Sequence, residues 1–190
     1  MILPIRAFGD SVLRKKCHDI SENYPDVQEL ISNMFETMYS ANGIGLAAPQ
    51  IGLDIRLFVI DISPLAEDED YEDIADEIKD FKKVFINAKI LEESGEEWKF
   101  NEGCLSIPDV REDVKRKETI LIEYFDENFV KHTETFSDIR ARVIQHEYDH
   151  IEGILFTDHL SNLKKKLVKG KLNKIANGDI SINYKMRFPK

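Results

Sequence analysis

The pentapeptide His-Glu-Tyr-Asp-His at residues 146–150 constrains this chain more than any other stretch of its sequence. On a helix, residues four apart lie one turn above each other. His146 and His150 therefore share a face and can place two imidazole nitrogens on one metal ion, with Glu147 at their flank. This is the HExxH arrangement of metal-dependent hydrolases.

The residues around the pentapeptide favour the helix that it requires. Ser137 is a candidate N-cap, Asp138 falls in the first turn and Gly153 is a candidate stop. Spacings of three and four define one stripe, which consists of Ile139, Val143, His146, His150 and Ile154. We therefore expect both histidines to face the protein interior.

A single buried histidine is more often a core residue bonded to the backbone than a metal ligand. Here two imidazoles and a carboxylate occur together, and burying them without partners costs on the order of a few kcal/mol each. One cation would satisfy all three groups. The alternative is a structural zinc protein, or a catalytically inactive homologue of these hydrolases that binds without turnover. A closed structural site, however, has no use for Glu147 beside its ligands.

The commonest downstream patterns do not supply the third ligand. A histidine six residues after His150 would fall at Phe156, and the only later glutamate, Glu152, is too close. Three downstream candidates stay open, namely Asp158, His159 and Asp179.

The upstream candidate is Cys104, within the segment Asn101-Glu-Gly-Cys-Leu-Ser-Ile-Pro108. A thiolate completes a tetrahedral site with two imidazoles and leaves one position for water, which is the catalytic rather than the structural pattern. Taken alone, an intracellular cysteine is ordinarily a small buried hydrophobic residue.

Length and composition indicate one globular domain over residues 1–190. Hydrophobic residues make up 42% and charged residues 33% of the chain, as in ordinary globular proteins. No stretch is long enough to cross a membrane, and the first residues lack a signal peptide's pattern. The two cysteines fit a reducing compartment. We therefore expect a cytoplasmic protein without a membrane partner.

Charge is distributed unevenly along the chain. The net charge of −10 argues against general nucleic-acid binding, DNA included, because neutralising phosphates requires a clustered basic surface. Residues 67–80 contain nine acidic side chains and one lysine, whereas residues 164–174 contain six lysines and no acid. The acidic run is expected to form a solvated loop or a short helix at an edge.

Hydrophobic periodicity predicts an α+β fold, with mainly antiparallel strands packed around a central HExxH helix. Helices are also expected near the N-terminus, at 25–41, and near the C-terminus, at 162–176. Apolar runs between turn residues predict strands at 53–62, 84–92, 97–100, 119–125 and 129–136, a hairpin turn at 126–128 and a last strand at 180–186.

Residues 43–52, Gly-Ile-Gly-Leu-Ala-Ala-Pro-Gln-Ile-Gly, predict a loop of fixed shape. Three glycines and a proline stop any helix and let the backbone approach a ligand closely. A phosphate cradle is excluded because no Lys-Ser/Thr follows and no strand precedes the segment. Gln50 is its one side chain with an amide to donate. Taken alone, such a segment is more often a tight turn with a surface glutamine.

Three segments together resemble the motifs of the peptide deformylase family. Residues 43–50 are similar to its first motif, Glu-Gly-Cys-Leu-Ser at 102–106 to its second, and Gln-His-Glu-Tyr-Asp-His at 145–150 to its third. The similarity in the order of elements extends over most of the chain, except for the acidic run and the tail after about residue 178. The resemblance implies a metalloenzyme that removes the formyl group from the initiator methionine of nascent peptides and releases formate.

The resemblance also implies a metal site made of Cys104, His146 and His150. Iron(II) would be its native ion, with nickel, cobalt or zinc able to take its place. The six lysines of 162–176, together with what the family does, suggest contact with ribosomal RNA. The alternative for these lysines is a solvated helix face.

The same resemblance implies the catalytic groups. Glu147 would take a proton from water activated by the cation and then deliver it to the leaving amine. Gln50 and the backbone N–H of Leu105 would bind the oxyanion. The methionine pocket would lie near Ile44, Gly45, Ile139 and Val143.

An HExxH endopeptidase is the nearest alternative in chemistry. The absence of a downstream ligand pattern and the motif around Cys104 argue against it. Activity on formyl-methionyl peptides, but not on the same peptides without the formyl group, would separate the two functions.

Overall fold

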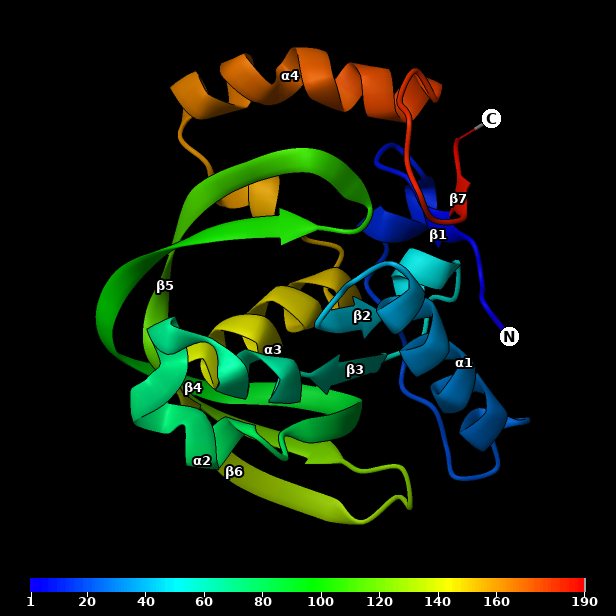
Figure 1. Cartoon of the computed structure of the whole chain (residues 1–190). Helices are drawn as coiled ribbons and strands as arrows, with labels where there is room; N and C mark the ends of the chain where they lie inside the picture. The colour runs from blue at the N-terminus through cyan, green and yellow to red at the C-terminus, as the bar shows by residue number, and fades with distance from the viewer. Residues whose placement is uncertain (190) are drawn as a thin grey trace.

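The computed structural model describes residues 1–189 and contains a five-stranded antiparallel sheet in the order β2-β3-β4-β5-β6 (Figure 1). Its strands are β2 (Gly45–Ala47), β3 (Leu57–Asp61), β4 (Lys82–Cys104), β5 (Ile107–Phe125) and β6 (Lys131–Ser137). A separate parallel pair joins β1 (Ile5–Arg6) to β7 (Met186–Arg187). The helices are α1 (Val27–Ser40), α2 (Ala75–Ile78), α3 (Asp138–Ile151) and α4 (Asn162–Asn177). This mixture of helices with an antiparallel sheet confirms the α+β class.

The hairpin of β4 and β5 is much longer than the separate strands predicted at 84–92, 97–100 and 119–125. Its pairing runs from Ile86 opposite Phe125 to Cys104 opposite Ile107, and register shifts bend it without ending it. The sequence did not predict a strand at residues 107–118, because charged side chains alternate there with isolated buried residues such as Val110 and Val114. The end of β4 thereby lies beside α3, where Cys104 Sγ is 3.3 Å from His150 Nε2.

The turn predicted between the last two strands of the sheet is confirmed. The carboxylate of Asp126 accepts hydrogen bonds from the backbone N–H groups of Asn128 and Val130, both at 2.9 Å. Phe129 adopts the left-handed conformation, with φ 56°. Because this residue completes the turn, β6 begins at Lys131 and not at 129.

Helix α3 carries the pentapeptide and contacts β2, β3, β5 and β6 (yellow in Figure 1). Ser137 occupies the N-cap position as predicted, but its hydroxyl makes no capping bond. Asp138 performs this role instead, since its carboxylate accepts a hydrogen bond from the Arg140 N–H at 3.0 Å. Gly153 follows the end of the helix with φ 76°, which a residue with a side chain rarely adopts.

Residues 43–52 are more regular than the predicted loop. Gly45–Ala47 form the edge strand β2 against β3, and Ala48–Ile51 form a 3-10 helix. The prediction was wrong for these residues because a glycine is tolerated in a short edge strand. In addition, Pro49 lies at the start of the 3-10 helix, where no backbone donor is required.

The segments outside the sheet and α3 largely agree with the predictions made from the sequence. Helix α1 confirms the predicted N-terminal helix, and the acidic run forms short 3-10 helices and α2. Helix α4 ends at Asn177 and is capped by Gly178, in agreement with the helix predicted at 162–176. The predicted strand at 180–186 is wrong except at Met186, because only Met186 and Arg187 pair with β1. Within the described chain, every helix is too short or too polar to span a membrane.

Candidate functional site

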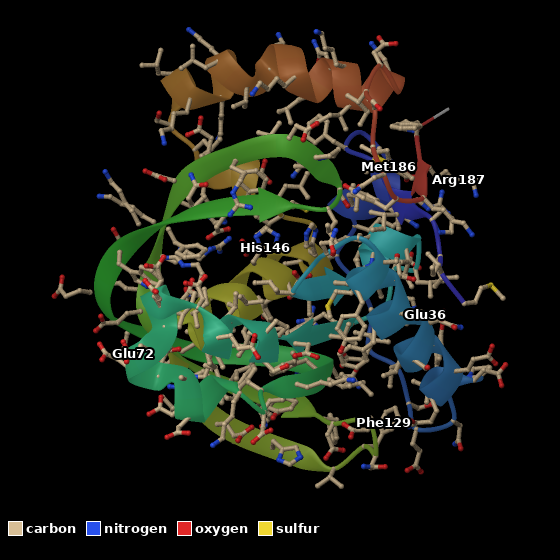
Figure 2. The ribbon with its side chains drawn as sticks, viewed as in Figure 1. Glu36, Glu72, Phe129, His146, Met186 and Arg187 are labelled. Atoms are coloured by element: carbon tan, nitrogen blue, oxygen red, sulfur yellow. The ribbon has the colours of Figure 1, made fainter. Side chains whose placement is uncertain are left out.

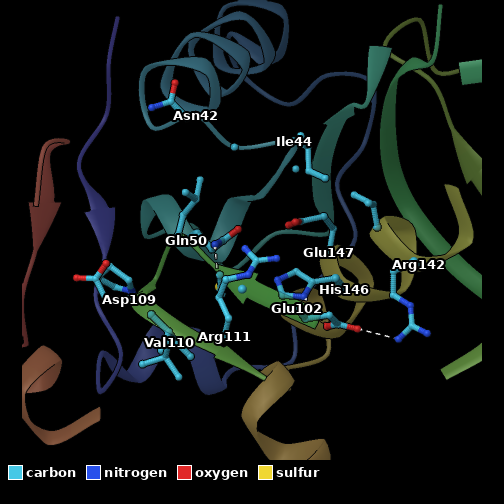
Figure 3. A pocket seen from close by; sticks show the side chains of 18 of the residues that line it. Asn42, Ile44, Gln50, Glu102, Asp109, Val110, Arg111, Arg142, His146 and Glu147 are labelled. Carbon is cyan, nitrogen blue, oxygen red and sulfur yellow. Dashed lines mark hydrogen bonds and ion pairs between the residues drawn. The ribbon is translucent and has the colours of Figure 1, made fainter. Parts of the chain in front are cut away.

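A cavity of about 480 Å³ lies between the β2 segment, the turn from β4 to β5, and α3. Its lining residues come from within 42–50, 100–111 and 142–147, together with Tyr184 of the C-terminal tail. Figure 3 shows Gln50, from the 3-10 helix at Ala48–Ile51, grouped with His146 and Glu147 of α3. The three sequence segments singled out above therefore meet at one place.

Cys104, His146 and His150 bring three ligand atoms together at this cavity. Their donor atoms all lie within 4.8 Å of one another, and Cys104 Sγ is 3.3 Å from His150 Nε2. Cys104 ends β4, and the histidines lie one turn apart on α3. This is the one such group of three found in residues 1–189. Of the downstream candidates, Asp158 pairs with Arg14 and His159 with Asp149.

Glu102 is a site residue that sequence reasoning missed. Its Oε2 lies 3.0 Å from His146 Nδ1. A proton on Nδ1 satisfies this contact and leaves the lone pair on Nε2, the nitrogen that a metal would use. Glu102 lies two residues before Cys104 on β4, and residues two apart on a strand share a face. Strand periodicity could therefore have identified it.

Two buried arginines hold Glu102 in place. Arg116 donates to both its oxygens, at 2.7 and 3.0 Å, and Arg142 donates at 2.9 Å. Burial alone would raise the pKa of Glu102, but hydrogen bonds from His146 and Arg116 outweigh it and hold the pKa well below its usual range. The carboxylate is therefore ionised and able to orient the His146 ring. Arg116 also bonds Asp149 at 2.7 Å, which ties the cluster to the far side of α3.

The same surroundings perturb two groups that line the cavity. Burial would raise the pKa of Cys104, but the rings of His150 and His146 outweigh it and lower the pKa to about 5. The thiolate, which is the form that binds metals, is thus favoured at neutral pH. Burial raises the pKa of Glu147 to about 7, although both histidines oppose the shift. A carboxylate poised near neutrality suits general acid–base chemistry.

Gln50 is buried beside the cysteine, so the interpretation of a surface glutamine is wrong. Its Oε1 accepts a hydrogen bond from the Ala47 N–H at 2.8 Å. This bond fixes the amide so that Nε2 lies 3.5 Å from Cys104 Sγ and 3.4 Å from Ser106 Oγ. The 3-10 helix at Ala48–Ile51, which the sequence did not predict, turns this side chain inward.

Gly45 makes room for Glu147. A Cβ atom at Gly45 would clash with the Glu147 carboxylate, so glycine is required here by the close approach of β2 to α3. Within residues 1–189, Oε2 of Glu147 is buried without a hydrogen-bond partner. An unpartnered buried carboxylate oxygen indicates a site for a polar ligand or water.

Most residues expected near a methionine pocket reach the cavity. Ile44, Gly45 and Val143 line it, as does Leu105 in the turn after β4. Ile139 does not lie among the lining residues. It is 2% exposed and packs in the core between α3 and the sheet, one turn before Val143.

The sequence model of a family described as polypeptide deformylase matches residues 2–166. A protein named peptide deformylase from Christiangramia forsetii is 62% identical over 190 residues, which cover 100% of this chain and 97% of the relative. One of the same name from Flavobacterium johnsoniae is 61% identical over 191 residues, covering 99% of this chain and 96% of the relative.

The fold of this chain is also similar to that of solved structures of the same family. The crystal structure of a peptide deformylase from Legionella pneumophila superposes with a TM-score of 0.79 at 37% identity, covering 94% of this chain and 98% of that one. Both the sequence and the fold of the relatives therefore extend over nearly the whole chain.

Proposed function

The chain belongs to the polypeptide deformylase family, and from this premise we propose how its residues remove the formyl group from the N-terminal methionine of nascent peptides. It is a metal-dependent hydrolase that releases formate. The observation that supports the assignment of its site is the convergence of Cys104, His146 and His150 beside the cavity that holds Glu147. An endopeptidase, the alternative from the sequence, has no separate observation in its favour.

Cys104, His146 and His150 would hold the metal. One thiolate and two imidazoles form a donor set suited to divalent iron, nickel, cobalt or zinc. The lowered pKa of Cys104 and the Glu102 contact that orients His146 both fit this role. We propose iron(II) as the native ion, as the family resemblance implies.

Glu147 would carry the proton. A divalent cation in the site lowers the pKa of water beside it and favours negative charge on the formyl oxygen. The Glu147 carboxylate accepts a proton as the water oxygen attacks the formyl carbon. It then donates this proton to the methionine nitrogen as the carbon–nitrogen bond breaks. Formate leaves, and the peptide keeps a free amino group.

Gln50 and Leu105 would stabilise the oxyanion. The Gln50 amide is fixed with Nε2 next to Cys104, and within residues 1–189 no backbone carbonyl accepts a hydrogen bond from the Leu105 N–H. The Leu105 N–H therefore has no backbone acceptor in this part of the chain to give up, and the Gln50 amide would exchange its long contacts with Cys104 and Ser106 for an oxygen that gains charge. A donor of this kind typically contributes about 3 kcal/mol to the transition state.

The methionine side chain would occupy the apolar part of the cavity. Ile44, Gly45 and Val143 line this part, and Ile139 supports Val143 from the core. We further propose that residues 1–190 act as one catalytic domain with α3 at its centre, because the cavity draws on β2, the β4–β5 turn, α3 and the tail together. The cytoplasm, where nascent peptides emerge, would be its place of action.

Formate release from a formyl-Met peptide tests this function. We expect turnover of the formylated peptide and no cleavage of the same peptide carrying a free or acetylated N-terminus. Cleavage at internal peptide bonds, with no formate released, would instead support the endopeptidase.

We propose that the lysine-rich helix α4 contacts ribosomal RNA. Lys165, Lys166 and Lys169 are exposed along this helix, whereas Lys164 is paired with Glu112 at 2.8 Å. Lysines that contact phosphates release bound counterions, so such docking should be strongest at low salt.

Charge reversal tests this contact without truncating the chain. Glutamate at Lys165, Lys166 and Lys169 should reduce co-sedimentation with ribosomes at low salt severalfold. The matched control reverses three exposed lysines of the β4–β5 hairpin, Lys89, Lys99 and Lys115. Equal sedimentation of the α4 variant and the wild type would reject docking through these residues.

A further inference from the structure

The C-terminal tail lies outside the family match at residues 2–166, yet it reaches the cavity. Tyr184 lines the cavity, and its hydroxyl donates a hydrogen bond of 2.7 Å to the backbone carbonyl of Leu105. The resemblance in the order of elements does not extend to this tail, but the tail touches a residue proposed to bind the oxyanion.

The turn from β4 to β5 explains why this contact is needed. Cys104 pairs with Ile107, so Leu105 and Ser106 are the two central residues of a tight turn. The carbonyl groups of such residues lie outside the strand ladder and require other partners. Tyr184 supplies one for Leu105, and the backbone N–H of Phe8 supplies one for Ser106 at 2.8 Å.

Both partners belong to terminal segments that are themselves fixed. Strands β1 and β7 lie side by side (Figure 1), and Figure 2 labels Met186 and Arg187 of β7. In their pairing Ile5 is opposite Met186. The Ile5 N–H donates to the Lys185 carbonyl at 2.9 Å. Met186 and Leu105 are both partly buried and pack against the same apolar core. Tyr184 is therefore held in position two residues before an anchored strand.

The peptide group between Leu105 and Ser106 is the most easily rotated part of the turn. Type I and type II turns differ mainly by rotation of this central peptide, which reverses the direction of its carbonyl. Tyr184 binds the carbonyl in one of these orientations. The bond therefore fixes the central peptide of the turn and restrains the backbone of Leu105, whose own N–H belongs to the preceding peptide.

We propose that Tyr184 is a positioning residue for deformylation, which holds the backbone of Leu105 in the turn so that the Leu105 N–H, in the adjoining Cys104–Leu105 peptide, faces the developing oxyanion. The inference rests on the proposed function of Leu105. Tyr184 would contact no reacting atom, and it would act through the turn.

The variant Tyr184→Phe removes the hydroxyl and keeps the ring against the cavity wall. We expect kcat on a formyl-Met peptide to fall about 3- to 10-fold, the rate equivalent of one hydrogen bond. KM and metal content should remain those of the wild type, because the interaction matters only when the oxyanion forms. Amide hydrogen exchange in the turn, residues 104–107, should become faster.

Tyr39→Phe is the matched control. It removes the hydroxyl of another tyrosine, which is bonded to Asp61 at 2.5 Å and does not line the cavity. Its kcat and its exchange in residues 104–107 should equal those of the wild type.

The remaining outcomes would overturn the inference. Faster exchange with unchanged kcat would make Tyr184 a purely structural tie, and a higher KM with unchanged kcat would make it part of the binding wall. A Tyr184→Phe variant equal to the wild type in every measurement would leave the tail without a role. Absence of formate release by the wild type would contradict the proposed function itself and remove this inference with it.

Discussion

The variant Glu147→Gln should retain its metal and bind formyl-Met peptide nearly as well as the wild type, but its turnover should fall by at least about 10². Glutamine keeps the shape and hydrogen-bonding capacity of the side chain but cannot accept a proton from water. The space made by Gly45 accommodates either side chain, so the fold should be preserved. Steady-state formate release, peptide affinity and metal content per chain together check this expectation.

Glu152→Gln is a matched control at the end of the same helix. Its carboxylate pairs with Arg56 at 2.6 Å and does not line the cavity. We expect it to turn over peptide at the wild-type rate. If Glu147→Gln works within a few-fold of the wild type, Glu147 has no part in proton transfer. If it loses its metal, Glu147 is a ligand.

Cys104→Ala should lower the metal content from about one ion per chain to near zero and abolish turnover. The substitution removes the only thiolate of the group and leaves two imidazoles, which hold a divalent ion far more weakly than three ligands. Elemental analysis after gel filtration measures the loss, and circular dichroism verifies that the variant remains folded.

Cys17→Ala is the control for this substitution. Cys17 is 4% exposed, and burial raises the pKa of its thiol to about 11. It therefore behaves as a buried apolar residue and should not bind metal. Metal loss in Cys17→Ala with retention in Cys104→Ala would reverse the ligand assignment.

The sequence predicted those parts of the site that depend on local periodicity. Helix α3 and the shared face of His146 and His150 follow from the 3.6-residue repeat, and the helix ends within a few residues of the predicted stop. The α+β class also followed, because turn residues separate most of the apolar runs. The sequence offered Cys104 as one candidate for the third ligand, and the resemblance singled it out, because a contact that spans more than 40 residues of chain leaves no local pattern.

The sequence did not predict features that depend on contacts between distant segments. The length of β4 and β5 was underestimated because exposed and charged side chains interrupt the apolar pattern along much of the hairpin. The burial of Gln50 depends on a 3-10 helix that forms against the turn of β4 and β5. Tyr184 meets Leu105 across 79 residues, through pairing of the two terminal strands, and no local pattern indicates such a contact.

Anomalous X-ray scattering from crystals of protein purified without oxygen tests the central claim most directly. Data on both sides of the iron absorption edge should give one strong peak per chain, with bonds of about 2.0–2.3 Å to Cys104 Sγ and to Nε2 of His146 and His150. The Glu147 carboxylate should lie near this peak without bonding to it. A peak bonded to Glu147 in place of Cys104, or a peak at Cys17 and His18, would contradict the account of the site.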